Sequence, residues 1–399
     1  MSLSIAIGND ILKRKDIYLD TAATTKPNKY IVESIMPYLT DKWYNPSSLY
    51  FESRDVSKDI KSARENIGNY IGAKGDEIYF TSGGSESNCW AIQGFVNYWK
   101  SKGYKPVIVT STIEHKSIMS CVEGLCVDTH FVGVYKDGCV KMTQLEELLK
   151  YISKNNPKSR ILVSVQFANN EIGIVQNIKA ITKIAHKYSA FIHTDAVQII
   201  GHLPIDVKEI DVDMLSASGH KFNALKGNGF LYIKSGVKIA PLIYGSQNNS
   251  MRGGTENVAG IVSMSQALDL CDTSYSCIKN KYTVREKFIN KILKLNYNLQ
   301  LNNSSDYGNS LPTVISLTIK ENVTAEALVY ILNSSGICIS SGSACNSYSE
   351  EPSYVLKAIG LSDEDAVRTI RISFSDDLTS EDMDRFVDEL NKAIKLLLS

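Results

Sequence analysis

The sequence has 399 residues, which is too long for one ordinary hydrophobic core and favours two or three domains, or one large α/β domain with an appendage. Lys and Arg total 43, as do Asp and Glu, so no net charge attracts nucleic acid or an anionic membrane surface. We therefore expect a small molecule or a protein as partner. No apolar run is long enough to cross a bilayer and the first residues lack a signal-peptide pattern, so we expect a cytoplasmic location.

Short β-branched or aromatic runs alternate with longer amphipathic stretches, and this alternation predicts an α/β fold with a mostly parallel sheet flanked by helices. The strands are expected at Ile78–Thr81, Val107–Thr110, Ile161–Gln166, Phe191–Thr194, Met214–Ser216 and Phe230–Ile233. The clearest helices are expected at Ser85–Lys100, Thr143–Lys154 and Ile178–Tyr188.

After about Gly260 the rhythm changes to a long helical stretch, and then a strand, a helix, a strand and a final helix follow. We expect these elements to form a smaller α+β domain. The predicted division is a large domain of residues 16–260 and a small domain of residues 1–15 and 261–399. The later elements are expected at Thr313–Ile319, Thr324–Ser334 and Thr369–Ser375.

The eight cysteines show no C-x-x-C spacing of the kind found in zinc or redox sites, and no metal site is predicted. Disulfide frameworks are typical of small secreted chains, so we expect most of these residues to be reduced structural thiols. They are Cys89, Cys121, Cys126, Cys139, Cys271, Cys277, Cys338 and Cys345.

Ligands of open parallel sheets bind beyond the carboxyl ends of the strands, so the residues that follow each predicted strand are the first candidates for a site. The segment "TSGGSESN" contains Gly84 and Ser85 at a strand-to-helix junction, where backbone amides, a hydroxyl and the helix N-terminus together could hold a phosphate. A plain turn with a serine cap is the simpler interpretation. The segment lacks the spacings of the P-loop and of dinucleotide-binding folds, which disfavours nucleotides.

Three further segments follow predicted strands. Asp195 in "FIHTDAVQ" ends an apolar strand, and a carboxylate buried there needs a cationic partner, although a capping role is the commoner case. Lys221 in "SASGHKF" lies among small residues, where a lysine can react with an aldehyde, although a solvated loop lysine would look the same. Asn169 and Asn170 in "FANNEIG" could lie at the same sheet edge as the other candidates, or they could mark only a turn.

One cofactor needs a lysine, a phosphate cradle and a carboxylate for a ring nitrogen together, and that cofactor is pyridoxal 5′-phosphate, PLP. His115 in "STIEHKS" follows the strand at Val107–Thr110 and is a candidate to stack on the ring. The combination predicts a PLP site, although each residue alone has a structural explanation.

The sequence resembles the NifS/IscS-like cysteine desulfurases, which are class V aminotransferases with the fold type I of PLP enzymes. The motifs that carry the resemblance cover nearly the whole chain. They are "YLDTAATTKP", "NPSS", "TSGGSESN", "EHKS", "NNEIG", "HTDAVQ", "SGHKF", "MRGGTEN", "SSGSACNS", "EPSYVLKAIG" and "TIRIS". The resemblance implies a seven-stranded large sheet and a homodimer.

The resemblance also implies a role for each matching residue. Lys221 would bind PLP covalently, Asp195 would pair with the pyridine nitrogen, and His115 would stack on the ring and assist proton transfer. Asn170 would lie beside cofactor and substrate, and Arg371 would bind the substrate carboxylate. The remaining implied cofactor contacts are the phosphate ligands Gly84, Ser85, Ser218 and His220, the ring-hydroxyl ligand Gln198, and Thr255, which would reach the phosphate in the partner subunit.

Cys345 lies in "SSGSACNSYSEEPSY", a stretch of small residues that suits a reactive thiol better than a core position. By resemblance, Cys345 is the nucleophile on a mobile loop at about 338–352. It takes the sulfur of L-cysteine, releases L-alanine, and passes its persulfide to an acceptor or scaffold protein for iron–sulfur clusters or thiolated tRNA. Cys345 is also a possible transient iron–sulfur ligand.

Several positions depart from the family pattern without removing a catalytic group, and they affect the expected substrate preference and acceptor. The departures are Thr21, Tyr50, Phe51, Ala224, Leu225, Asn248, Asn249 and Ser375. Two alternatives therefore remain at this point. One is a selenocysteine lyase or another PLP-dependent β-lyase, and the other is a non-catalytic sulfur carrier or scaffold.

Overall fold

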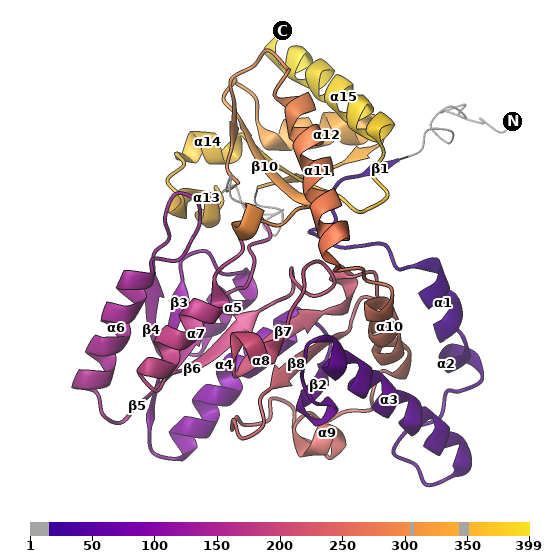
Figure 1. Cartoon of the computed structure of the whole chain (residues 1–399), viewed down its shortest axis with the longest axis vertical. Helices are drawn as coiled ribbons and strands as arrows, with labels where there is room; N and C mark the ends of the chain where they lie inside the picture. Colours follow the sequence, from indigo (N-terminus) through magenta and orange to yellow (C-terminus); the bar gives the residue numbers. More distant parts are fainter. Residues whose placement is uncertain (1–15, 304–306, 343–350) are drawn as a thin grey trace, which may run out of the picture.

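The computed structural model describes residues 16–303, 307–342 and 351–399 (Figure 1). A seven-stranded sheet with the strand order β2-β8-β7-β6-β5-β3-β4 forms the larger layer. Only β8 runs antiparallel to its neighbours, so the predicted mostly parallel α/β fold is confirmed. The strands are β2 (Ile78–Thr81), β3 (Lys105–Ser111), β4 (Asp128–Val132), β5 (Ser159–Ser164), β6 (Phe191–Asp195), β7 (Met214–Ser218) and β8 (Gly229–Ile233).

Helices cover both faces of the large sheet. Successive residues of a strand point to opposite faces, so each strand packs against helices on both sides. In β3, Ile108 packs with α4 and α5, whereas Val107 and Val109 pack in the core on the other face, which includes α3, α6, α7 and α10. These buried runs read as continuous apolar segments because both faces are covered. The helices are α1 (Lys29–Ile35), α2 (Pro37–Thr40), α3 (Phe51–Tyr70), α4 (Gly84–Ser101), α5 (Lys116–Gly124), α6 (Met142–Asn155), α7 (Ile178–Lys187), α8 (Val207–Ile210), α9 (Gln247–Ser250) and α10 (Val258–Asp269), with the short 3-10 helices η2 (Gly75–Glu77) and η3 (Gly219–Lys221).

A second, antiparallel sheet with the order β12-β13-β10-β9 lies above the first in Figure 1, and α11, α12 and α15 accompany it. A separate parallel pair joins β1 to β11. The elements are β1 (Ile17–Tyr18), α11 (Tyr275–Ile292), β9 (Leu299–Leu301), η4 (Tyr307–Asn309), β10 (Val314–Ile319), α12 (Ala325–Ser334), β11 (Ile337–Cys338), β12 (Ser340–Ser341), α13 (Tyr354–Ala358), α14 (Asp363–Val367), β13 (Thr369–Ser373) and α15 (Ser380–Leu398).

The hydrophobic side chains form separate cores for the two sheets. Ile17 and Leu19 pack with the smaller sheet, whereas Ile261 and Met264 of α10 pack beneath the large sheet. The division at residue 260 stays a prediction. None of the helices in the described part of the chain is long and apolar enough to cross a membrane.

Candidate active site

The carboxyl ends of β3, β5, β6 and β7 meet at one edge of the large sheet, because these strands are parallel neighbours. His115 follows β3, Asn170 follows β5, Asp195 ends β6, and Lys221 ends η3 directly after β7. Four residues that are far apart in the sequence therefore lie at the edge where parallel sheets bind ligands.

Asp195 is buried, with 6% of its surface exposed, and two donors fix its carboxylate. Asn88 of α4 donates from Nδ2 to Oδ2 at 2.7 Å, and the backbone N–H of Val197 donates to Oδ1 at 3.0 Å. An ionised carboxylate accepts about four hydrogen bonds, so it can still accept one from a protonated ring nitrogen.

His115 is joined to the same network. It caps α5, because its Nδ1 accepts from the backbone N–H of Ser117 at 3.1 Å and lies 2.8 Å from Ser117 Oγ. Ser117 Oγ also accepts from Asn88 Nδ2 at 2.9 Å. In the neutral ring the acceptor at Nδ1 leaves the proton on Nε2. The network thus fixes both the orientation and the tautomer of His115.

Lys221 lies inside the site, and its amine is held by backbone carbonyls. Nζ donates to the carbonyl oxygens of Ala22 at 2.6 Å and Ala23 at 2.8 Å. Gln198 Nε2 donates to the same oxygen of Ala22 at 3.0 Å. The "DTAATT" segment therefore joins the predicted lysine to the predicted ring-hydroxyl ligand.

The start of α4 forms a cradle for an anion. Gly83 has φ of 152°, and a Cβ on Gly84 would lie 2.7 Å from Val197 Cγ2, so glycine is required for this close approach. A Cβ on Gly83 would lie 3.6 Å from the hydroxyl of Ser218, and Ser85 is exposed at the same turn. The free N–H groups and dipole of an 18-residue helix favour a phosphate here.

His220 lies next to Lys221 as a neutral imidazole. Burial and the positive charge of Lys221 lower the pKa of His220 to about 4. Its Nδ1 lies 3.1 Å from Thr24 Oγ1, and its backbone oxygen accepts from Thr25 Oγ1 at 2.9 Å. Near pH 7 the ring can donate a hydrogen bond to a phosphate without adding a charge.

Arg371 of β13 is almost fully buried, with 1% of its surface exposed, and connects the two sheets. Nη2 donates to Asp20 Oδ1 at 2.7 Å and to Ser340 Oγ at 3.2 Å, and Nη1 donates to the backbone oxygen of Asn170 at 3.1 Å. Within the described residues, buried Nε has no hydrogen-bond partner. A substrate carboxylate would have to replace Asp20 as the anionic partner.

Two glutamates at this edge were given no role from the sequence, the buried Glu114 and the half-buried Glu171 that follows Asn170. Burial raises the pKa of Glu114 to about 8 and that of Glu171 to about 7. Glu114 Oε2 accepts from the backbone N–H of Gln166 at 2.9 Å, and Glu171 Oε2 accepts from Ser353 Oγ at 2.5 Å. Each glutamate is next in sequence to a predicted site residue, but the sequence does not show which side chains become enclosed in the folded protein.

Two predicted residues remain to be considered. Thr255 is exposed on the segment between α9 and α10. Cys345, with most of the predicted loop at 338–352, lies outside the described residues.

Some departures from the family pattern have a local structural reason. Asn248 and Asn249 have φ of 47° and 56°, a left-handed conformation that asparagine tolerates better than most residues. Asn248 also accepts from Arg64 Nη2 at 2.9 Å. Ala224 is buried beside Gly219, and Ser375 donates to Asp377 just beyond β13. Tyr50 is half exposed before α3. These contacts do not explain why leucine stands at position 225 in place of the residue usual in the family.

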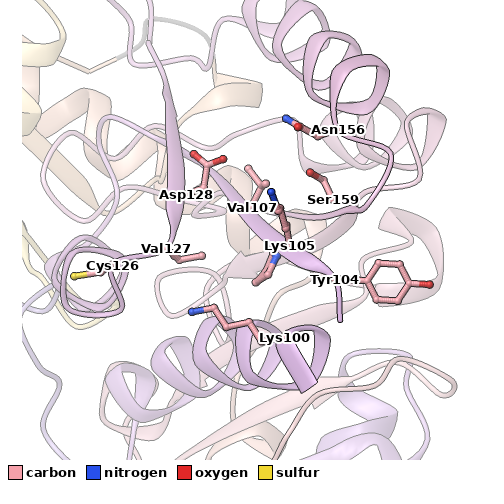
Figure 2. Close-up of a pocket in the computed structure, with 10 residues that line it drawn as sticks. Lys100, Tyr104, Lys105, Val107, Cys126, Val127, Asp128, Asn156 and Ser159 are labelled. Atoms are coloured by element: carbon pink, nitrogen blue, oxygen red, sulfur yellow. The ribbon is translucent and has the colours of Figure 1, made fainter. Parts of the chain in front are cut away.

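A cavity of about 340 Å³ lies at the opposite edge of the sheet, where β3, β4 and β5 begin (Figure 2). Lys105, Asp128 and Ser159 line it as the first residues of these strands, and the exposed Cys126 lies beside it. Among the residues that the structure describes, none of the predicted site residues lines this cavity.

Comparison with known proteins identifies the class. The model of the class-V aminotransferase family matches residues 17–386. A cysteine desulfurase IscS of Dictyoglomus turgidum is 40% identical over 389 residues, which are 96% of each chain. The cysteine desulfurase IscS of Methanosarcina thermophila is 40% identical over 395 residues, 96% of this chain and 93% of that one. This chain therefore belongs to the class-V aminotransferase family.

Solved structures agree with this assignment. A NifS-like protein superposes with a TM-score of 0.86 at 30% identity and covers 96% of this chain and 100% of its own. A protein described as SspA in complex with cysteine superposes with a TM-score of 0.76 at 34% identity and covers 90% of this chain and 98% of its own. The expected family and fold type are confirmed.

Proposed function

We propose that this protein is a PLP-dependent L-cysteine desulfurase. The reaction converts L-cysteine and the thiol of Cys345 into L-alanine and a persulfide on Cys345, so every atom of the substrate is accounted for. The observation that carries the proposal is the convergence of the Lys221 amine, the buried Asp195 carboxylate and the Gly84 cradle at one sheet edge. The relatives named cysteine desulfurase support the same activity.

The donor set fits PLP. Lys221 supplies the amine for the aldehyde, Asp195 a carboxylate for the ring nitrogen, and the start of α4 the N–H groups for the phosphate. Gln198 would face the ring hydroxyl, while Ser85, Ser218 and His220 would complete the phosphate site. Bound PLP supplies an aldehyde and an electron-accepting ring.

The protein side chains orient the reaction. Asn88 holds Asp195 in place, and Ser117 holds His115 with its proton on Nε2, where it can be exchanged with a substrate. Arg371 would bind the substrate carboxylate once Asp20 is displaced, and Asn170 would lie beside it, since its backbone oxygen already accepts from Arg371.

Cys345 would act as the nucleophile toward the substrate sulfur and then deliver that sulfur to an acceptor or scaffold protein. We also propose a homodimer in which Thr255 reaches the phosphate site of the partner, and a cytoplasmic location. Exposure of Thr255 is consistent with a role in a second subunit.

The direct test measures cysteine-dependent release of alanine and sulfide in the presence of a reductant. Lys221→Ala should lose the visible absorbance of bound PLP and the activity together, because no covalent bond to the cofactor can form. Cys345→Ser should keep the absorbance and lose turnover of cysteine. Cys126→Ser is the matched control, since Cys126 is exposed at the opposite sheet edge, and should behave as wild type.

The same assay separates the alternatives. A Cys345→Ser protein that still releases selenide from selenocysteine would support a selenocysteine lyase. A wild-type protein that accepts a persulfide but forms no alanine from cysteine would contradict the proposal and support a sulfur carrier.

A further inference from the structure

Two cysteines lie together on the adjacent helices α4 and α5, behind the candidate active site. Cys121 Sγ lies 4.0 Å from the carbonyl oxygen of Cys89, and Cys89 Sγ lies 3.7 Å from the carbonyl oxygen of Ser117. Both side chains are half-buried, so small solutes can reach them. Neither residue has a role in the proposed reaction.

The two thiols differ in acidity because they interact with each other. A hydrogen bond from the Cys121 thiol lowers the pKa of Cys89 to about 7, while the same contact and burial raise the pKa of Cys121. The lowered pKa increases the thiolate fraction of Cys89, and the thiolate is the form that attacks electrophiles. Cys121 stays protonated beside it.

The pair is connected to the residues that would hold the cofactor. Asn88, the residue before Cys89, donates to both Asp195 and Ser117, and the backbone oxygen of Ser117 is the one that Cys89 approaches. Ser117 in turn fixes His115. Cys89 is therefore connected to Asp195 through Asn88, and to His115 through Ser117.

We propose that Cys89 and Cys121 form a peroxide-sensitive dithiol that closes to a disulfide between α4 and α5. The Cys89 thiolate attacks one oxygen of a hydroperoxide, the O–O bond breaks, and Cys89 becomes a sulfenic acid while water, or an alcohol from an organic peroxide, leaves after protonation. The thiol of Cys121 then attacks the Cys89 sulfur and water leaves. Two thiols are oxidised by two electrons and one peroxide is reduced. A thiol reductant reverses the change.

Closure of the disulfide removes the Cys89 thiol from the carbonyl of Ser117 and joins the second turns of the two helices. We expect the environment of His115 and Asp195 to change with it. The inference does not depend on desulfurase activity, because disulfide formation is read from the protein itself.

The test treats the full-length reduced protein with hydrogen peroxide, blocks the remaining thiols, and maps tryptic peptides by mass spectrometry. Wild type should yield peptide 75–100, which carries Cys89, linked to peptide 117–136, which carries Cys121. Peptide 117–136 also carries Cys126, so Cys126→Ser is the control and should retain the link. Cys121→Ser and Cys89→Ser should each lose it.

A second readout tests the connection to the site. Peroxide should shift the visible absorbance of the PLP-loaded wild type and dithiothreitol should restore it, whereas the shift should be lost in Cys121→Ser or, if that variant folds poorly, in Cys121→Ala. A linked peptide that persists in Cys121→Ser, or the absence of any link in wild type, would overturn the proposal. An equal absorbance shift in wild type and Cys121→Ser would overturn the connection to the site.

Discussion

Asn88 donates both of its amide hydrogens, one to Asp195 and one to Ser117. Asp195 is the predicted partner of the ring nitrogen, and Ser117 holds His115, which is predicted to stack on the ring. Its remaining oxygen, Oδ1, is buried without a hydrogen-bond partner among the described residues. Buried polar atoms usually have partners, and each exception calls for an explanation. The two hydrogen bonds that Asn88 donates therefore position Asp195 and Ser117.

Asn88→Asp should impair cofactor binding and activity. The change replaces a donor with a carboxylate within 2.7 Å of Asp195, so a favourable contact becomes a repulsion between like charges. Loss of a hydrogen bond to a charged group costs about 1.5–3 kcal/mol, which corresponds to roughly 10- to 100-fold weaker PLP binding. Equilibrium binding of PLP measures the effect. Asn155→Asp, at an exposed position on α6, is the control, and equal binding by the two variants would contradict the role of Asn88.

Glu114 gives a prediction for stability against pH. Burial raises its pKa from 4.5 to about 8, so between these values the folded state binds a proton that the unfolded state has lost. The free energy of unfolding should therefore fall as pH rises from about 4.5 to 8, by up to about 1.4 kcal/mol per pH unit for this single proton.

Glu114→Gln should remove this part of the pH dependence. Glutamine resembles protonated glutamic acid, since its oxygen can accept from the backbone N–H of Gln166 and its NH2 can donate to Ser111 Oγ. Urea unfolding at pH 5 and pH 8 should show similar stability at pH 5 and higher stability of the variant at pH 8. Parallel pH profiles for variant and wild type would show that Glu114 does not titrate in this range.

Candidate site residues could be proposed from the sequence where the chemistry required an unusual residue type at a strand end. Lys221, Asp195 and His115 are such residues, and the structure brings them to one edge. Glu114 and Glu171 could not be predicted, because their significance lies in burial and in contacts with Gln166 and Ser353 that come from distant segments.

At the level of elements, buried strands were predictable because both of their faces are apolar. Ile78–Thr81 matches β2, and the other predicted strands of the large sheet overlap β3, β5, β6, β7 and β8. The edge strand β4 was not predicted, because Asp128 and His130 interrupt its apolar pattern. The strands β1, β9, β11 and β12 are too short for an alternation of apolar and polar residues to appear. The long helical stretch after Gly260 is two helices, because Ser274 caps a new helix after the break that follows Asp269.

Gly260 of α10 should be one of the least replaceable positions in a helix. A Cβ there would lie 1.8 Å from Oδ1 of the buried Asn228, which accepts from Asn257 at 3.0 Å. Gly260→Ala should lower stability by about 1–3 kcal/mol through overpacking. Gly124→Ala, at the end of α5 with no heavy atom within 4 Å of the added methyl, should be neutral or slightly stabilising. Urea unfolding midpoints compare the pair, and equal midpoints would refute the packing argument.

At the scale of the whole molecule, one side of the large layer exposes an apolar surface, which we define by Trp43, Leu49 and Phe51. These side chains are 68%, 89% and 77% exposed. The segment that carries them runs from the end of α2 to the start of α3 (Figure 1). Large apolar side chains exposed close together in the sequence are candidates for contact with a partner. A cavity of about 600 Å³ beside it is lined by Ser47 from the same segment and by Glu256, the neighbour of Thr255. The segment that carries the apolar surface and the segment that carries Thr255 therefore border the same cavity, which favours a shared interface in the proposed homodimer.

Leu49→Asp combined with Phe51→Asp should separate the homodimer, because two charges would be buried where two apolar side chains meet the partner. Analytical ultracentrifugation should show a mass near twice 44.2 kDa for wild type and near 44.2 kDa for the double variant. The double variant should also bind PLP more weakly, since Thr255 of one subunit would no longer reach the phosphate in the other. Tyr151→Asp, at a 63% exposed position on α6, is the control and should remain dimeric, since α6 lies on the opposite side from α2 and α3 in Figure 1. A double variant that keeps the wild-type mass would exclude this surface as the interface, and a monomer that binds PLP as tightly as wild type would exclude the role of Thr255.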